Sequence, residues 1–546
     1  IRTIISKELN VDISLKDFLA NNTIEMLSSL IKKGYKSAKI EYPELVVDKK
    51  NMYEPFPLTE VQMAYLMGRE NHFEMGGVST HGYSEMETKL DIEKLNEALL
   101  KVINYQPMLR TIVLSSGEQI VLENVPKYEI KVIDISNVEK EEQDEFIKLE
   151  REKTSHNMFK TDQWPLFEFK AFKIDNDKHY LFTSFDMLIT DGASIQIIGN
   201  LLIKFYNDIN WNPADKQCTY RDYILALKEF KKGDVYVRDK EYWLNKVADF
   251  PSAPMLTLKE NPAKIKTPHF KRFEERFTKN DWQKLKNKAS EKNVTASALL
   301  AAAYAEVLAF WSNQNHFALN LTVFNRMPFH KEINDIVGDF TSVILLEINF
   351  EGNKSFWERA QAIQVKLMEA LEHRHYDGIE FIREIAKYND YGTKSVMPVV
   401  FTSVILGNKT SDEPGWNEIG EVKMSSGQTS QVYLDHQAFE ENGCLELVWD
   451  YVDEIFDVDV IDSMFSNYVE LFKKLIQKES PINCIDIPNK DKIFIENYNN
   501  SEEDFSVDII QNLFKEQVKR VPNASAVEMN DKKISYKELD ERSNEV

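Results

Sequence analysis

The stretch YLFTSFDMLITDG, residues 180–192, predicts a buried strand that runs directly into a helix. Residues 180–187 are mostly apolar, aromatic or β-branched, a composition typical of a strand. After Asp191 and Gly192 the apolar side chains recur at helical spacing, at Ile195, Ile198, Leu202 and Phe205. Because strands alternate with helices over about residues 55–245, we expect this part of the chain to form one α/β lobe.

A second lobe is predicted after the proline-containing stretch 250–262. It includes an apolar helix at 296–311 and strands at 396–406, 431–435 and 444–451, and it ends near residue 480. The apolar spacing of the helix is typical of core packing and carries no functional signal by itself.

The composition indicates a globular, multidomain chain and argues against several function classes. With 546 residues, 43% of them hydrophobic and 11% aromatic, the chain has room for roughly two to four folding units. Its net charge of −22 would repel phosphate backbones, so nucleic acid is not an expected partner. The most apolar stretch, 298–311, contains Glu306 and is shorter than the roughly 20 residues that cross a bilayer, so we expect no membrane span.

The cysteines favour a reducing compartment. Cys218, Cys444 and Cys484 are odd in number, far apart in the sequence and without C-x-x-C spacing, so they predict no disulfide framework and fit the cytoplasm. No metal-ligand spacing and no glycine-rich phosphate loop is visible, so we expect no metal and no cofactor within the domain.

The two ends of the chain indicate parts of further domains. Residues 1–35 predict short helices, with Asn22 as the cap of a helix at 23–33 and Glu25 in the capping box. The start, IRTIISKE, lacks an initiator Met and a signal pattern, so we expect a piece of a longer polypeptide. At the other end a polar stretch precedes a helix at 509–520.

A second informative stretch is FPLTEVQMAYLMGR, residues 56–69. In physical terms it is a proline-led helix capped by Thr59. Asp191 also precedes a helix, and a capping Asp stabilises a helix by about 0.5–2 kcal/mol. Structural roles are therefore the expectation for both residues from the local pattern alone.

Together these motifs resemble the heterocyclization domains of nonribosomal peptide synthetases, a branch of the condensation-domain family. Residues 56–69 match the opening motif of that branch at every fixed position, and Asp186 and Asp191 match its Asp-x-x-x-x-Asp motif. Ordinary condensation domains carry His-His-x-x-x-Asp-Gly at this place, whereas Met187 stands where the second His would be. The resemblance implies a structural role for Asp191, through an ion pair to an arginine such as Arg326.

Further segments follow in the order of the family. They are residues 295–311, VGDFT at 337–341, MPVVFTS at 397–403, and QTSQVYLD at 428–435 followed by Trp449-Asp450. The departures are Ser430 in place of a proline, YQPML at 105–109 in place of Arg-His-x-Met-Leu, and a partial match at 250–256. These differences concern substrate or linker details more than the class of reaction.

The candidate catalytic residues come from the second lobe. Strand alternation predicts Gln431, Tyr433 and Asp435 on one polar face. From the pattern alone, Asp435 would be an exposed carboxylate at a strand end, but the resemblance implies that it is the catalytic acid/base. Thr402, ordinarily a β-branched strand residue, matches the catalytic Thr of the family. Three further residues are candidates to line a substrate tunnel, namely Asn325, Gln431 and Arg326.

The resemblance covers about residues 55–480. It implies an α/β fold of two chloramphenicol-acetyltransferase-like lobes, arranged as a V-shaped pseudo-dimer around a central tunnel. The expected domains are the C-terminal part of a peptidyl carrier domain (1–36), a linker (37–54), the N-terminal lobe (55–250), the C-terminal lobe (251–480), a second linker (481–507) and the start of an adenylation domain (508–546), where ISYKEL at 534–539 resembles the opening pattern.

The implied reaction joins an upstream carrier-bound acyl or peptidyl thioester to Cys, Ser or Thr on a downstream carrier domain, then cyclizes and dehydrates the product to a thiazoline or oxazoline. Both substrates would arrive on the 4'-phosphopantetheine arms of neighbouring carrier domains, with an adenylation domain adjacent. Two alternatives stay open. One is an amide-forming condensation domain that does not cyclize, and the other is a carrier-docking module without turnover.

Overall fold

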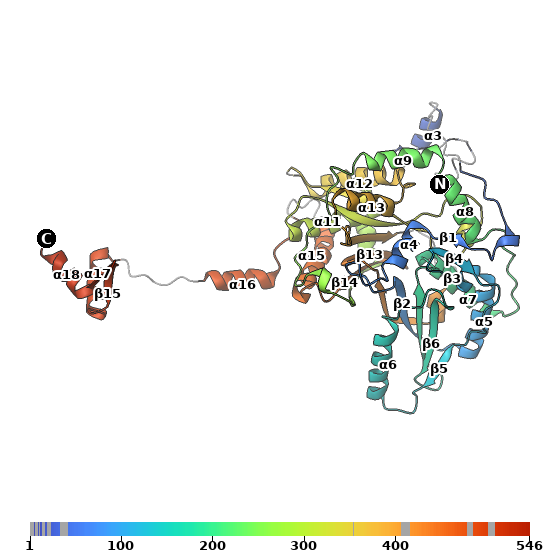
Figure 1. Ribbon diagram of the computed structural model, residues 1–546, viewed down its shortest axis with the longest axis horizontal. Helices are drawn as coiled ribbons and strands as arrows, with labels where there is room; N and C mark the ends of the chain where they lie inside the picture. Colours follow the sequence, from blue (N-terminus) through green and yellow to red (C-terminus); the bar gives the residue numbers. More distant parts are fainter. Residues whose placement is uncertain are drawn as a thin grey trace. The chain divides into compact units, whose positions relative to one another are not determined.

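The computed structural model describes residues 23–32, 42–352, 354–405, 415–477, 484–500 and 508–546, together with six single positions before residue 19 (Figure 1). The chain forms two compact units, Ile1–Asp486 and Ile487–Val546. In the first unit the predicted N-terminal helix is present as α3, Ile24–Lys32, and the Thr23 hydroxyl accepts a hydrogen bond from the Met26 amide at 3.2 Å. The predicted cap, Asn22, lies outside the described residues.

The first large sheet has five strands in the order β12-β2-β7-β6-β5. These strands are β12 (Glu421–Gln428), β2 (His81–Thr88), β7 (His179–Asp186), β6 (Phe167–Lys173) and β5 (Lys131–Asp134). Helices α5 (Ile92–Tyr105) and α7 (Gly192–Asn207) pack on one face, and α6 (Lys140–Thr154) packs on the other. The last six residues of β7 are all buried, as expected for a strand that is covered on both faces.

A small three-stranded sheet, in the order β1-β4-β3, carries the other motif of the first lobe. Its strands are β1 (Phe56–Pro57), β4 (Glu118–Val121) and β3 (Thr111–Val113), and α4 (Glu60–Met67) follows β1 directly. The predicted cap is confirmed, because Thr59 and Gln62 form a complete capping box at the start of α4.

The second large sheet has six strands in the order β10-β9-β11-β13-β14-β8. They are β10 (Thr341–Asn349), β9 (His316–Phe324), β11 (Val399–Val404), β13 (Leu434–Glu441), β14 (Cys444–Val452) and β8 (Phe270–Phe277). Strand β11 runs parallel to both of its neighbours, and the other pairs are antiparallel.

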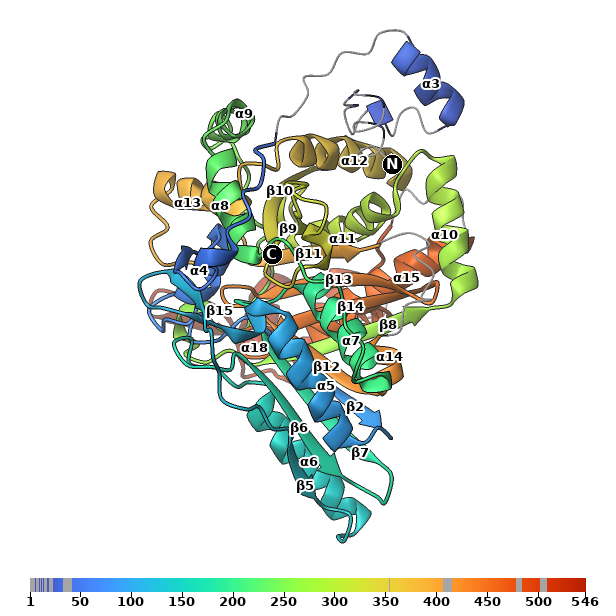
Figure 2. The same ribbon diagram turned by 90° about the vertical axis from the view of Figure 1, so that its right-hand side faces the viewer.

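Four helices pack on one face of this sheet: α10 (Lys279–Glu291), α11 (Ala296–Ser312), α12 (Phe356–Glu372) and α15 (Val458–Gln477). Figure 2 shows α11, α12 and α15 beside the strands. The covered face carries Phe401, Leu434 and Trp449, so the intervening residues of the same strands point to the opposite face. The remaining elements of the first unit are α8 (Tyr220–Phe230), α9 (Asp234–Leu244), α13 (Gly378–Tyr388), α14 (Trp416–Ile419), η1 (Lys49–Asn51), η2 (Pro107–Arg110), η3 (Pro262–Lys264) and η4 (Ile333–Asp335).

The two halves of the first unit exchange segments. Strand β12 follows β11 in the sequence, yet it pairs antiparallel with β2 and so completes the first sheet. Met327, Ile333 and Phe340 likewise pack in the core of the first lobe, although they lie between strands of the second sheet. The sequence analysis did not predict this exchange, because strand pairing between distant segments leaves no local pattern.

The structure corrects one predicted strand and confirms others. The predicted strand at 431–435 is wrong, since Gln431 lies in a turn with a φ of 62° and β13 begins at Leu434. Gln431, Tyr433 and Asp435 therefore do not share one regular strand face. The predicted helix at 296–311 is confirmed as α11. The predicted strands at 396–406 and 444–451 correspond to β11 (Val399–Val404) and β14 (Cys444–Val452).

The second unit contains α16 (Asn489–Asn499), α17 (Ile510–Arg520), a hairpin of β15 (Ser525–Met529) with β16 (Lys532–Ser535), and α18 (Tyr536–Asn544). Ser535 and Glu538 form a capping box at the start of α18. The predicted helix near 509–520 is confirmed as α17.

Within the described ranges, no single helix has the length and apolar character needed to cross a bilayer. Only α10 and α11 taken together reach that threshold, and their axes meet at 97°.

Candidate active site

Asp435 lies at the start of β13, on the sheet face opposite the four covering helices. Directly across the antiparallel pair stands Asp450 of β14. The side-chain amide of Gln437 donates to Asp435 Oδ2 at 3.1 Å and to Asp450 Oδ2 at 3.2 Å. The other oxygen, Asp435 Oδ1, is buried and has no hydrogen-bond partner among the described residues. This oxygen therefore keeps an unused capacity to accept a hydrogen bond or to carry a proton.

Asp450 is held by Arg272 of β8, its cross-strand neighbour. The guanidinium contacts both carboxylate oxygens, with Nε 2.7 Å from Oδ1 and Nη2 2.6 Å from Oδ2. A third nitrogen, Nη1, donates to the Ser425 hydroxyl of β12 at 2.6 Å. The pair is buried, with 16% of the Arg272 side chain and 2% of the Asp450 side chain exposed. Such a two-pronged contact stabilises the ionised carboxylate of Asp450.

The surroundings of Asp435 favour its protonated form. Burial, and then the negative charge of Asp450, raise the pKa of Asp435 from 3.8 to about 7, against the opposing effects of Gln437 and Arg272. Burial also raises the pKa of Asp450, and Arg272 opposes that shift. A carboxyl group that titrates near neutral pH suits proton transfer in both directions.

Thr402 of β11 lies on the same face as Asp435. The parallel register places Val400 beside Asp435 and Thr402 beside Gln437, so Thr402 and Asp435 are diagonal neighbours. The structure therefore brings together the two residues that the sequence analysis expected to be catalytic. It adds Gln437, the direct neighbour of Thr402 across the strands, which the sequence pattern did not single out although it lies two residues after Asp435 on the same strand face.

Asp186, the first motif aspartate, is fully buried at the end of β7. Its carboxylate forms an ion pair with Arg69, and its Oδ1 accepts a hydrogen bond from the Leu188 amide at 3.0 Å. Arg69 also donates to the Phe159 carbonyl at 2.8 Å. Asp186 thus connects the turn after β7 to the segment that follows α4.

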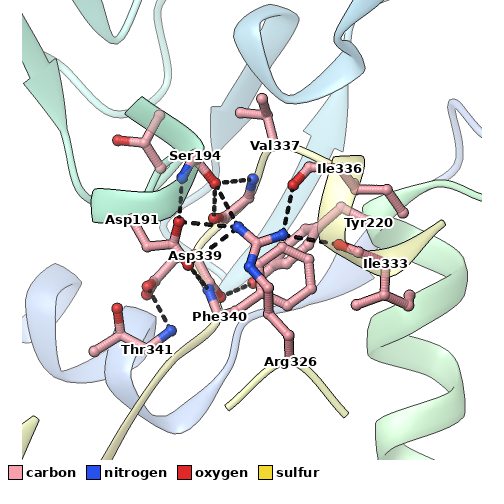
Figure 3. A network of polar contacts seen from close by, with 12 residues as sticks. Asp191, Ser194, Tyr220, Arg326, Ile333, Ile336, Val337, Asp339, Phe340 and Thr341 are labelled. Carbon is pink, nitrogen blue, oxygen red and sulfur yellow. Dashed lines mark hydrogen bonds and ion pairs between the residues drawn. The ribbon is translucent and has the colours of Figure 1, made fainter. Parts of the chain in front are cut away.

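Asp191, the second motif aspartate, caps α7 and accepts from the Ser194 amide at 2.6 Å. Figure 3 shows Arg326 reaching the same carboxylate, with Nη2 3.1 Å from Oδ1. The Phe340 amide donates to Asp191 Oδ2 at 3.3 Å. The expected ion pair between Asp191 and Arg326 is therefore confirmed, and it links the two halves of the chain.

Asn325, one of the three residues predicted to line a tunnel, borders a cavity of about 240 Å³. Other lining residues include Thr59, Lys231, Asp339, Arg374 and Asp377. Arg326 instead donates through Nη1 to the Ile333 and Ile336 carbonyls, both at 2.8 Å, which is the pattern of a structural anchor. Gln431 lies in a turn, where its backbone amide donates a hydrogen bond to the Met75 carbonyl at 3.1 Å.

The turn before β13 touches the end of α4. A Cβ placed on Gly68 would lie 1.9 Å from the Ser430 hydroxyl oxygen and 2.5 Å from its Cβ. Gly68 and Ser430 therefore pack without room for any larger residue at position 68.

One cluster away from these residues has the composition of a metal site. Among the described residues, Cys218, His330 and Glu332 place their ligand atoms within 4.8 Å of one another. The thiol lies 3.1 Å from His330 Nδ1, and burial raises the pKa of Cys218 to about 11. A protonated thiol that donates to the imidazole accounts for the contact without an ion.

Comparison with known proteins identifies the family of this chain. Residues 52–492 match the Condensation domain family. Bacitracin synthase 1 of Bacillus licheniformis is 40% identical over 544 residues, which is 99% of this chain and 10% of that protein. Phenyloxazoline synthase MbtB of Mycobacterium tuberculosis is 28% identical over 513 residues, which is 90% of this chain and 35% of that protein. The chain thus spans between a tenth and about a third of these two relatives.

Among solved structures, the EpoB NRPS cyclization-docking bidomain from Sorangium cellulosum superposes with a TM-score of 0.75 at 32% identity. The match covers 84% of this chain and 92% of that one. The predicted α/β fold of two chloramphenicol-acetyltransferase-like lobes is confirmed by this similarity. The chain belongs to the condensation-domain family and, within it, to the heterocyclization domains of nonribosomal peptide synthetases.

Proposed function

We propose that the chain joins an upstream acyl or peptidyl thioester to a carrier-bound Cys, Ser or Thr, and then closes and dehydrates the ring. In the first step the amine attacks the thioester carbonyl, a C–N bond forms, and the upstream carrier leaves as a thiol. In the second step the side-chain thiol or hydroxyl adds to the new amide carbonyl. Loss of that oxygen as water, with loss of the nitrogen-bound proton, gives the C=N bond of a thiazoline or oxazoline.

The observation that carries the proposal is the environment of Asp435. Its Oδ1 atom is buried without a partner, and its carboxyl group has a pKa raised to about 7. The hydroxyl of the ring intermediate is a poor leaving group unless it is protonated. A positioned acid/base contributes about 10²–10⁴-fold to such a step, and Asp435 is the group we assign to it.

Thr402 supports the same step in this proposal. It lies diagonally from Asp435 on the same sheet face, and Gln437 is its direct neighbour across the strands. We assign to its hydroxyl group a hydrogen bond to the departing oxygen while Asp435 transfers the proton. Condensation itself requires mainly that the amine and the thioester be held together. Such positioning can lower the activation barrier by several kcal/mol.

The carriers and neighbouring domains also belong to the proposal. The relatives are multidomain synthetases with carrier and adenylation domains. We infer that residues 1–36 end a carrier domain, that 55–250 and 251–480 form the two lobes with linkers at 37–54 and 481–507, and that 508–546 begin an adenylation domain. The substrates would arrive on phosphopantetheine arms, with Asn325 lining their path. A cytoplasmic location stays a prediction from the cysteine content.

The experiment is intact mass spectrometry of the downstream carrier after incubation with a loaded upstream carrier and a Cys-loaded downstream carrier. The expected wild-type product is lighter than the linear dipeptidyl thioester by one water. Asp435→Asn should accumulate the linear product, whereas Glu441→Gln, which changes an exposed carboxylate on the same strand, should behave as wild type. Linear product from the wild type would identify an amide-forming condensation domain, and no new bond would identify a docking module.

A further inference from the structure

We propose that Asp450 is a positioning residue for the dehydration step: clamped by Arg272 and linked through Gln437, its negative charge holds Asp435 in the acid form, with Oδ1 as the atom that carries the proton. This inference rests on the proposed function and extends it to three residues that the sequence motifs did not identify as functional.

The Asp450 carboxylate cannot turn away from Asp435. Arg272 contacts both of its oxygens, at 2.7 Å and 2.6 Å, and the register of β13, β14 and β8 places Asp435, Asp450 and Arg272 in one row across the sheet. The guanidinium is always charged at physiological pH, so it favours the ionised form of Asp450. Arg272 therefore favours the negative charge on Asp450 and the proton on Asp435.

Strand β12 of the other sheet packs against Arg272 and Asp450. Ser425 accepts a hydrogen bond from Arg272 at 2.6 Å, and a Cβ at Gly427 would lie 3.3 Å from Asp450 Oδ2. Gly427 therefore packs closely against the carboxylate, and a methyl group at this position would press on Asp450 Oδ2. The position of Asp450 consequently depends on the strand exchange between the two lobes.

Gln437 determines which oxygen of Asp435 can carry the proton. Its amide nitrogen has two hydrogens and donates to Oδ2 of both carboxyl groups, at 3.1 Å and 3.2 Å. Oδ2 of Asp435 is thus an acceptor, whereas Oδ1 has no partner among the described residues. A proton on Oδ1 faces no competing donor and is available for transfer.

Apart from Gln437 and Arg272, which lower the pKa of Asp435, the groups near Asp435 do not oppose the effect of the Asp450 charge. The groups that act on Asp435 or on its neighbours are Asp450 of β14, Arg272 and Glu274 of β8, Tyr304 of α11 and Tyr65 of α4. The two tyrosines are neutral, because burial raises the pKa of each well above its ordinary value. Arg272 is the one cation in this group, and its two-pronged contact is with Asp450.

The test compares the pH dependence of water loss in the wild type and in Asp450→Asn, with linear and dehydrated products measured separately. Water loss requires protonated Asp435, so its rate falls as the pH rises through the pKa of Asp435. Removing the charge of Asp450 lowers that pKa. The alkaline limb of the pH–rate profile, where the rate falls with rising pH, should therefore shift to lower pH by about one unit or more. The rate of condensation measured in the same reaction should change less than the rate of water loss.

Glu446→Gln is a matched control. Glu446 and Arg276 form the same cross-strand pair on the same two strands, with a 2.8 Å ion pair, but are more exposed. This variant makes an equivalent change of charge next to Phe439 instead of Asp435, so its alkaline limb should coincide with that of the wild type.

A second variant keeps the proposal testable if Asp450→Asn does not fold. The hydrogen bond from Gln437 lowers the pKa of Asp435, so Gln437→Met should move the alkaline limb of the pH–rate profile upward, opposite to Asp450→Asn. If the wild type forms a heterocycle but the alkaline limb of the pH–rate profile is unchanged in both variants, the role of Asp450 is overturned. The proposed function would then remain intact. Wild-type protein that forms no heterocycle at any pH would instead overturn the proposed function.

Discussion

Arg326 joins Asp191 across 135 residues of chain, with Nη2 3.1 Å from the carboxylate oxygen Oδ1. The Asp191 side chain is fully buried, and 9% of the Arg326 side chain is exposed. The same guanidinium binds the carbonyls of Ile333 and Ile336, so one side chain fixes the start of α7 and the segment that crosses from the second lobe. The motif aspartate is thus a structural link between the two halves.

Arg326→Ala should lower the free energy of unfolding by about 3–5 kcal/mol, because it leaves a buried carboxylate without its partner. Urea or thermal unfolding measures the change. Lys140→Ala, which breaks an exposed ion pair with Asp144 on α6, should change stability by less than about 0.5 kcal/mol. An Arg326→Ala variant as stable as the wild type would argue against the structural role of the pair.

Gly68→Ala should destabilise the protein by about 1–3 kcal/mol, because the new methyl group overlaps the Ser430 side chain. The φ of Gly68 is −62°, so backbone strain does not contribute. The double variant Gly68→Ala/Ser430→Gly removes the overlapping atoms and should recover most of the loss in a thermal melt. Failure of the double variant to recover stability would place the cost at the other near contact, the Ala64 carbonyl oxygen.

Asp435→Asn should stabilise the folded protein at alkaline pH. In the folded state the pKa of Asp435 is raised from 3.8 to about 7. The contribution of this group to the stability of the wild type is therefore greatest below pH 4, and it is lost as the pH rises through 7. At pH 8 the variant avoids a penalty on the order of 2–4 kcal/mol.

Denaturant unfolding of wild type and Asp435→Asn at several pH values measures this difference. The difference in the free energy of unfolding between the two proteins should be largest above pH 7 and should decrease steadily toward pH 4. Glu441→Gln, at the exposed end of the same strand, should show no such trend. A difference that does not depend on pH would mean that Asp435 titrates alike in the folded and unfolded states.

Thr402→Val should slow water loss by about tenfold or more while condensation changes little, because the substitution keeps the shape and removes one hydrogen bond to the departing oxygen. The ratio of dehydrated to linear product on the carrier measures the effect. Thr402→Ser keeps the hydroxyl group and should restore most of the dehydration. Equal losses in both variants would indicate a packing role for the β-branched side chain.

Local sequence patterns predicted many of the elements. Asp191 caps α7 and Thr59 caps α4 as expected, since a cap depends on residues within one turn. The apolar residues of α11 also predicted its burial. The strand at 431–435 was predicted wrongly because alternation alone does not reveal a residue such as Gln431, whose positive φ belongs to the turn before β13.

The sequence by itself determined the family, the order of the elements and the choice of Asp435 and Thr402 as candidates. Only the tertiary structure decided what surrounds them. Arg272, Ser425, Gln437 and Asp450 come from four strands, and β12 lies in the other sheet. Cross-strand register, set by pairing between segments far apart in the chain, places these side chains together, and no local periodicity encodes that register.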